Sequence, residues 1–198
     1  MAKWRSSSGP RTGSFNALEL VFRHLGSDTA VLRERATETV DALAFRENGL
    51  ANWAPRVGPG GLLESVGDGL IRMQWCHGAP GVVTSLAGLA EDDVGLSELM
   101  LSGGELTWTA GPLQKGASVC HGTAGNGYAF LKLFELTQDE LWLERARMFA
   151  THALLQVRHA RSTYGRGRHS LWTGDLGLAV YASQCVSAAA GVPTIDYW

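Results

Sequence analysis

The chain has 198 residues, enough for one domain with a sizeable core, since about 150 residues already bury roughly 70% of their surface. Its 17 basic and 19 acidic residues leave a net charge of -2, which gives no electrostatic reason to expect a nucleic acid or an anionic membrane as partner. The polar start has no signal-peptide core, and no apolar run is long enough to be a transmembrane segment. We therefore expect a soluble cytoplasmic protein. Three cysteines are too few for a disulfide framework, so in a reducing compartment we expect them to serve metal binding or chemistry.

The first third of the chain predicts two helices and a long loop. We expect residues 1–14 to be a disordered leader, because Ser, Gly and Pro dominate there. Residues 15–198 are expected to form one domain. Apolar spacing predicts helices over 15–25 and 29–46, the second with Asp28 as its N-cap. Residues 51–69 are rich in Gly and Pro and predict a long loop.

The second half of the chain alternates two kinds of helix. Residues 139–160 predict an amphipathic helix with water on one side. Its expected apolar stripe consists of Leu143, Ala146, Phe149, Ala150, Ala153, Leu154 and Val157. The segments 127–136 and 176–190 are apolar nearly all round, a pattern that favours helices buried on every side. We therefore expect inner and outer helices in turn.

Three glycine-marked segments punctuate this alternation. They are CHGAPG at 76–81, CHGTAG at 120–125 and WTGDLG at 172–177, and in each of them two glycines stand three residues apart. The spacing of 44 and then 52 residues suits a pair of helices with its loops. Stacked pairs of this kind predict an all-α fold, an α/α toroid built as a double layer of helical hairpins, with an open helical solenoid as the alternative.

Two of the marks carry Cys-His-Gly triplets, and a toroid would bring such turns together at one end of its inner helices. A thiol at the start of a helix favours its thiolate form, and a catalytic zinc takes three protein ligands and keeps one position open. Cys76, Cys120 and His121 can supply those three ligands. The alternatives are a structural zinc closed by His77 and two ordinary buried cysteines.

These segments resemble the lanthionine synthetase C family, LanC and the bacterial LanC-like proteins. The resemblance rests on QWCHGAPGVV, VCHGTAGNGYAFLKLFELTQDELWLERARMFA, SLWTGDLGLAVYASQC and PTIDYW. It is strong from Arg72 to Trp198 and faint before. It implies an α/α toroid in which zinc, held by Cys76, Cys120 and His121, activates a thiol. That thiol adds to dehydroalanine or dehydrobutyrine in a peptide. The cyclases close thioether rings in this way, whereas LanC-like proteins are associated with the addition of glutathione.

The implied reaction needs two further groups. After the thiol attacks, an enolate must gain a proton, and His77 is the candidate acid because the pKa of histidine lies near neutrality. The alternative for His77 is a simple hydrogen bond to a carbonyl group. Arg72 is the candidate for stabilising the enolate oxygen.

The chain also departs from the family. Its members have about twice this length, so the resemblance implies that the N-terminal half is missing, that the ring is incomplete, and that a second chain could complete the toroid. The family's further catalytic Asp and His have no counterpart, since Asp28, Asp41 and His24 lie in no matching motif. A non-catalytic module that binds zinc or a thiol peptide is therefore the alternative function. A second alternative is a protein prenyltransferase-like subunit, since those α/α barrels also present a thiol to zinc. The absence of their Asp/Cys/His ligand pattern from this sequence argues against it. A cysteine protease is excluded because the neighbours Cys120 and His121 point apart.

Three other features have plainer expectations. Cys185, in an apolar helix, is expected to pack in the core. The basic stretch 158–169 is expected to be solvated rather than to grip a peptide. Trp75 and Trp172 stand beside the glycine turns and could line a pocket.

Overall fold

The structure, a computed structural model, describes residues 29–54, 56–57, 63–64, 72–193 and 196. The described part is all-α apart from two short hairpins, as predicted. The helix expected over 15–25 and the leader lie outside the described residues, as do Asp28 and His24. In the described part no helix is long and apolar enough to cross a membrane.

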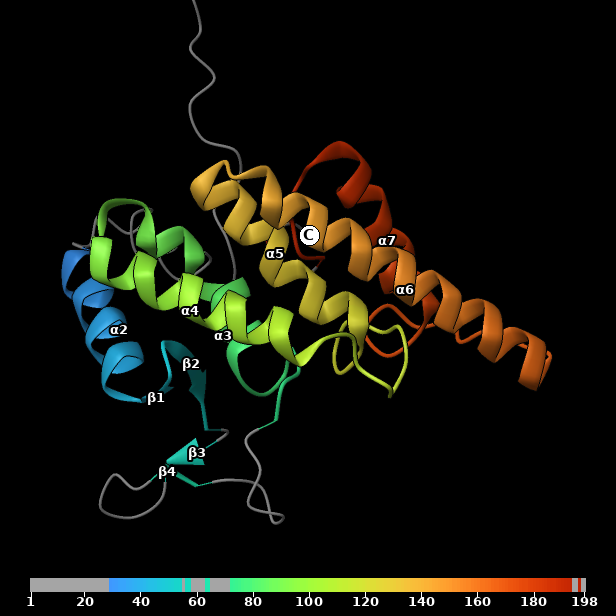
Figure 1. The fold of residues 1–198 in the computed structure, drawn as a ribbon, viewed down its shortest axis with the longest axis horizontal. Helices are drawn as coiled ribbons and strands as arrows, with labels where there is room; N and C mark the ends of the chain where they lie inside the picture. Colours follow the sequence, from blue (N-terminus) through green and yellow to red (C-terminus); the bar gives the residue numbers. More distant parts are fainter. Residues whose placement is uncertain (1–28, 55, 58–62, 65–71, 194–195, 197–198) are drawn as a thin grey trace, which may run out of the picture.

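The helices form two layers (Figure 1). Three inner helices, α3 (Ala79–Leu86), α5 (Thr123–Thr137) and α7 (Asp175–Ser187), each begin at one of the three glycine marks. The outer helices α4 (Val94–Ala110) and α6 (Glu140–Tyr164) run back across them, α4 against α3 and α5, and α6 against α5 and α7. A 3-10 helix, η2 (Ala87–Asp92), connects α3 to α4. The described helices therefore make an arc of the predicted α/α toroid.

The second glycine of each mark is required by close packing of the turn. A Cβ atom there would lie 1.9, 1.8 and 2.1 Å from a carbonyl oxygen six residues earlier, in the pairs Gly81–Trp75, Gly125–Val119 and Gly177–Leu171. No real Cβ atom tolerates such a distance from a backbone oxygen. The three marks are thus one repeated turn, in which the chain folds back tightly before the inner helix starts.

Backbone hydrogen bonds join the three turns to one another. The amide of Cys76 donates to the carbonyl oxygen of Cys120 at 3.2 Å, and the amide of Cys120 donates to that of Trp172 at 2.8 Å. These three residues hold the same place in their turns, two positions before the first glycine. The predicted convergence of the turns at one end of the inner helices is therefore built into the backbone.

The core lies between α5 and its neighbours. Every residue of α5 from Thr123 to Leu133 is buried, which confirms the inner helix predicted over 127–136. Phe130 of α5 meets Phe149 of α6 edge to face, with ring centres 4.8 Å apart. The apolar stripe predicted for α6 is confirmed for most of its members, but Leu154 is 44% exposed.

Helix α7 corrects the expectation of a helix buried on every side. Its buried residues are Gly177, Leu178, Tyr181 and Cys185, whereas Leu176 is 51% and Val186 is 82% exposed. An apolar sequence shows that a helix can be buried, but burial also needs a neighbour on each side. In the described part of the chain the main packing partners of α7 are α5 and α6.

The segment before the first turn also differs from its prediction. Helix α2 (Ala30–Ala42) ends four residues before Arg46, and the chain continues into a hairpin of β1 (Ala44–Glu47) and β2 (Leu50–Trp53). Asn48 and Gly49 turn between the strands with φ of 51° and 77°. Asn-Gly is the strongest short hairpin signal, and it decides this region against helix propensity. A second pair, β3 (Arg56–Val57) and β4 (Leu63–Glu64), lies in the stretch expected to be a loop.

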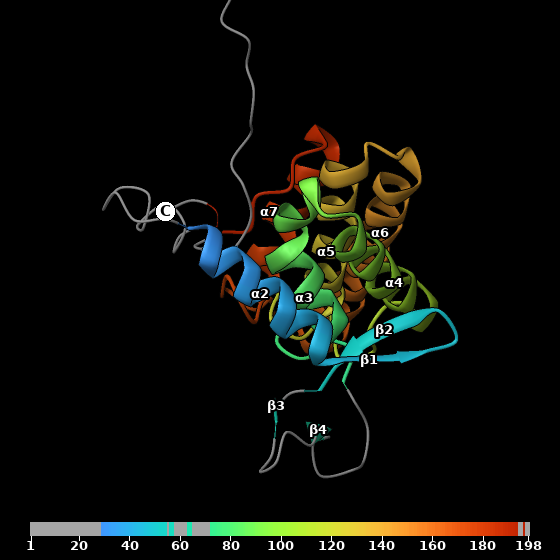
Figure 2. The ribbon, with the colours of Figure 1, turned by 90° about the vertical axis from the view of Figure 1, so that its left-hand side faces the viewer.

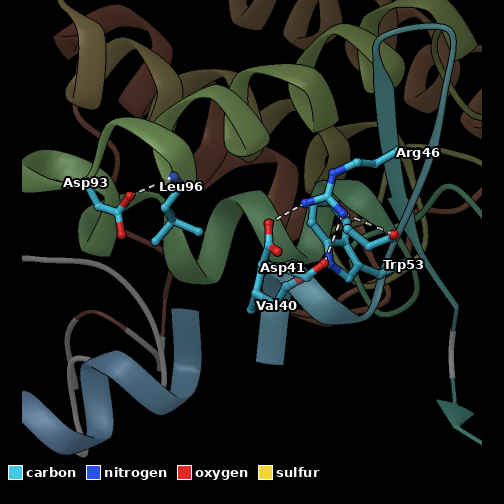
Figure 3. A network of polar contacts seen from close by, with 7 residues as sticks. Val40, Asp41, Arg46, Trp53, Asp93 and Leu96 are labelled. Carbon is cyan, nitrogen blue, oxygen red and sulfur yellow. Dashed lines mark hydrogen bonds and ion pairs between the residues drawn. The ribbon is translucent and has the colours of Figure 1, made fainter. Parts of the chain in front are cut away.

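Side chains fasten this hairpin to the helices. The indole nitrogen of Trp53 donates to the carbonyl oxygen of Val40 at 2.9 Å, and Arg46 pairs with Asp41 across the end of α2 (Figure 3). Strand β2 packs against α3 and α4, and Figure 2 shows the hairpin beside them. The hairpin is thus part of the wall that supports the first turn.

Candidate functional site

The first Cys-His-Gly triplet forms a closed turn. Gln74 and His77 exchange two backbone hydrogen bonds of 2.9 Å, which places Trp75 and Cys76 at the tip. Gly78 has φ of +106°, and a Cβ atom there would lie 2.0 Å from the carbonyl oxygen of Arg72. Glycine is therefore required by both conformation and space. The geometry leaves the Cys76 thiol exposed, beside the N-terminus of α3.

The structure brings Cys76 and Cys120 together. Their backbones are hydrogen bonded, and their thiols are close enough to influence each other. Desolvation raises the pKa of Cys76, although its side chain keeps contact with solvent, and the neighbouring Cys120 raises it further. Two thiolates this close repel each other, whereas a cation between them would favour both.

The two histidines of the triplets lie differently. Nδ1 of His77 is 3.2 Å from the sulfur of Cys76, so this ring contacts the thiol. His121 is half-buried and lines a cavity beside the second turn. Among the described residues, no three side chains of His, Cys, Asp or Glu are grouped closely enough to hold a metal ion. The structure therefore assembles two of the three predicted ligands.

The donor types fit zinc better than the arrangement does. Two adjacent thiols with imidazoles beside them are the ligands that zinc prefers. The third predicted donor, His121, is next to Cys120 in the chain but faces the cavity. Zinc at Cys76, Cys120 and His121 stays a prediction.

The cavity beside the second turn measures about 900 Å³ and is strongly basic. Its charged and histidine lining residues are Lys115, His121, His159, Arg161, Arg166, Arg168, His169 and Asp175. The single carboxylate among them, Asp175, lies 3.3 Å from Arg161. The basic stretch expected to be solvated thus forms one wall of this cavity. Lys115 also lowers the pKa of Cys76, so the cavity lies within electrostatic reach of the thiol pair.

The remaining candidate residues, Arg72, the two tryptophans and Cys185, lie in packed positions around the site or in the core. Arg72 is half-buried, and its carbonyl oxygen lies under Gly78. Trp75 and Trp172 pack against each other with ring centres 4.9 Å apart, and neither is among the residues that line the cavity. Cys185 is buried in α7 beneath α6, which confirms its expected role in packing.

Sequence reasoning missed two asparagines that contact the first turn. Asn52 of β2 is 7% exposed, and Asn126 of α5 has no exposed surface. Asn52 lies in the stretch expected to be a loop, and Asn126 lies one residue before the apolar segment predicted over 127–136. The signal for both was a polar residue among buried apolar ones, since buried polar groups find hydrogen-bond partners.

Comparisons with known proteins agree with this architecture. The chain is 41% identical over 120 residues to the protein named glutathione S-transferase LANCL1 of Danio rerio, a match that covers 59% of this chain and 29% of that protein. It is 39% identical over 83 residues to LanC-like protein GCL1 of Arabidopsis thaliana, covering 40% of this chain and 19% of that one. The chain thus spans less than a third of the length of these relatives. The profile of the family described as lanthionine synthetase C-like protein matches residues 25–190. With its inner helices starting at stacked glycine turns, two of which carry Cys-His-Gly triplets, the chain belongs to the lanthionine synthetase C-like family.

Proposed function

We propose that this chain takes part in adding a thiol, that of glutathione, to dehydroalanine or dehydrobutyrine residues of a peptide or protein, with zinc at Cys76, Cys120 and His121. The observation that carries the proposal is the contact between Cys76 and Cys120, next to His121, which lines a basic cavity. A relative bears the name glutathione S-transferase, which supports glutathione as the thiol. We keep the cytoplasm, where glutathione is abundant, as the predicted location.

The charge of the cavity supports an anionic thiol substrate. Glutathione carries two carboxylates, and Lys115, Arg166 and Arg168 offer cations on the cavity wall. Arg161 is partly neutralised by Asp175, so these three are the cations we expect to bind the substrate. A cavity of about 900 Å³ has room for a tripeptide.

Zinc, when bound, would lower the pKa of the incoming thiol and so supply a nucleophile at neutral pH. In the addition a sulfur–carbon bond forms at the β-carbon, and the α-carbon gains a proton, so nothing leaves. His77 is the proposed proton donor, because its ring lies at the thiol pair. Arg72 remains the proposed partner of the enolate oxygen.

The second candidate function is a non-catalytic binding module. It is favoured by one observation: no three metal-binding side chains are grouped in the described part of the chain. Such a module would hold a thiol or a thiol peptide in the cavity without forming a product.

Incubation of the purified chain with zinc, glutathione and a dehydroalanine peptide tests the proposal. We expect the peptide to gain the mass of one glutathione, faster than in buffer alone, by intact mass spectrometry. Cys120→Ala should return the rate to that of buffer. Cys185→Ala, which removes a buried thiol on α7, should keep the activity and is the matched control.

The outcomes separate the two functions. Glutathione binding by calorimetry without any product favours the binding module. A rate in Cys120→Ala equal to that of the unchanged chain would overturn the proposed site.

A further inference from the structure

We propose that Asn52 and Asn126 are positioning residues, which hold the Cys76–His77 turn at its two ends and so set the Cys76 thiol against Cys120. The inference rests on the proposed function only in taking this turn as the site. Neither residue touches the reacting thiols in the described contacts. Their effect would pass through the backbone of the turn.

Asn52 holds the end of the turn. Its Oδ1 accepts hydrogen bonds from the amide of Ala79 at 2.8 Å and from that of Trp53 at 2.9 Å. Ala79 is the first residue of α3, where backbone amides have no partner inside the helix. The N-cap residue itself is Gly78, which has no side chain to accept such a bond. Asn52 therefore caps α3 from another element, strand β2.

Asn126 holds the start of the turn. Its Nδ2 donates to the carbonyl oxygen of Met73 at 3.0 Å, while its side chain is fully buried in α5. Asn126 follows Cys120 by six residues, in the helix that the second triplet begins. This single bond thus ties the helix behind Cys120 to the segment that leads into Cys76.

The side-chain amides of Asn52 and Asn126 have opposite hydrogen-bonding roles. Both partners of Asn52 Oδ1 are donors, and the partner of Asn126 Nδ2 is an acceptor, so neither amide can be turned over. Aspartate at position 52 would keep the acceptor, and its charge suits a helix N-terminus. Ionised aspartate at position 126 would lose the donor and face a carbonyl oxygen. Isosteric Asn→Asp substitutions should therefore have opposite effects.

The test measures how fast dibromobimane bridges two thiols in the reduced, metal-free chain at pH 8. This reagent fluoresces once both of its arms have reacted, so it reports the juxtaposition of Cys76 and Cys120. We expect Asn52→Asp to bridge as fast as the unchanged chain. Asn52→Leu and Asn126→Asp should bridge about tenfold more slowly, the equivalent of one buried hydrogen bond.

Three controls keep the result specific. Single-site alkylation by iodoacetamide should stay within about twofold in all variants, because the thiols remain equally exposed while only their alignment changes. Ser102→Ala removes the bond from Ser102 to Gly49 at the tip of the hairpin, and it should leave bridging unchanged. Circular dichroism reports whether each variant folds, and if Asn126→Asp does not, the Asn52 pair carries the test.

Equal bridging in Asn52→Leu and Asn52→Asp, whether both fast or both slow, would overturn the inference. The assay needs neither zinc nor turnover. A chain that adds no glutathione can therefore still pass it, so failure of the inference and failure of the proposed function are distinguishable.

Discussion

Cys185 and Tyr181 of α7 form a buried pair against α6, and this pair makes the stability of the fold fall at alkaline pH. Tyr181 is fully buried, and its hydroxyl donates to the carbonyl oxygen of Ala146 at 2.7 Å. Burial raises the pKa of the Cys185 thiol to about 11, and burial together with Cys185 raises the pKa of Tyr181. Both groups therefore hold their protons more tightly in the folded chain than in the unfolded one.

We predict that Cys185→Ala flattens the loss of stability at alkaline pH. Because the folded pKa is raised, the stabilising term is complete below about pH 9 and is lost as pH rises towards about 11. A difference of about two pKa units between the folded and unfolded states corresponds to roughly 3 kcal/mol of unfolding free energy lost over this pH range. Cys185→Ala removes this contribution to the loss. Urea unfolding of both chains at pH 8 and at about pH 10.5 measures it. Ser187→Ala, at an exposed site of α7, should lose as much stability between the two pH values as the unchanged chain. An equal loss in Cys185→Ala would contradict the prediction.

Neighbouring residues of a turn can point their side chains into different surroundings, so a sequence motif predicts the position of the turn better than the contacts of each side chain. The Cys-His-Gly spacing correctly placed Cys76 beside Cys120, because repeated turns stack through backbone hydrogen bonds. It did not place His121, which lines the cavity, or His77, which contacts the thiol. Side chains of adjacent residues point in different directions, and the backbone path alone decides which of them meet.

At the scale of elements, the repeated glycine turn makes the structure intolerant of a single methyl group. We predict that Gly125→Ala costs about 3 kcal/mol of unfolding free energy, because its Cβ would lie 1.8 Å from the Val119 oxygen and 2.9 Å from Cβ of Trp75. Denaturant unfolding measures this change. Gly95→Ala is the control, since Gly95 is exposed in α4 and its nearest atom would be 3.6 Å away. Alanine there should be neutral or stabilising by up to about 1 kcal/mol, and equal losses at both sites would refute the packing argument.

The elements differ in how well the sequence predicts them. Apolar residues on all sides correctly predicted burial of α5, which has neighbours on each face, but the same pattern failed for the exposed face of α7. The β1–β2 hairpin was missed, although Asn48-Gly49 is a hairpin signal, because the preceding residues have good helix propensity. Local patterns thus predict the kind of element, whereas exposure and short strands depend on contacts between elements.

At the scale of the whole molecule, one buried ion pair fastens the C-terminal segment to the inner layer. Lys132 of α5 has no exposed side-chain surface, and its Nζ lies 3.1 Å from Oδ2 of Asp196, which is equally buried. The same oxygen accepts a hydrogen bond from the amide of Val192 at 2.7 Å. Lys132 also reaches Glu135 at 3.3 Å, but that side chain is 38% exposed.

We predict that Asp196→Asn destabilises the chain by about 3–5 kcal/mol, because it leaves the Lys132 ammonium buried without its carboxylate. Glu135→Gln should cost less than about 1 kcal/mol, since water screens that pair. The double variant Lys132→Met with Asp196→Asn should recover part of the loss, because it also removes the buried ammonium that Asp196→Asn leaves with the part-exposed Glu135 as its remaining carboxylate. Thermal and urea unfolding of the unchanged chain, Asp196→Asn, Lys132→Met and the double variant give the coupling between the two sites. If Asp196→Asn were no worse than Glu135→Gln, the segment would be held by its apolar contacts, with Val192 fully buried, rather than by this ion pair.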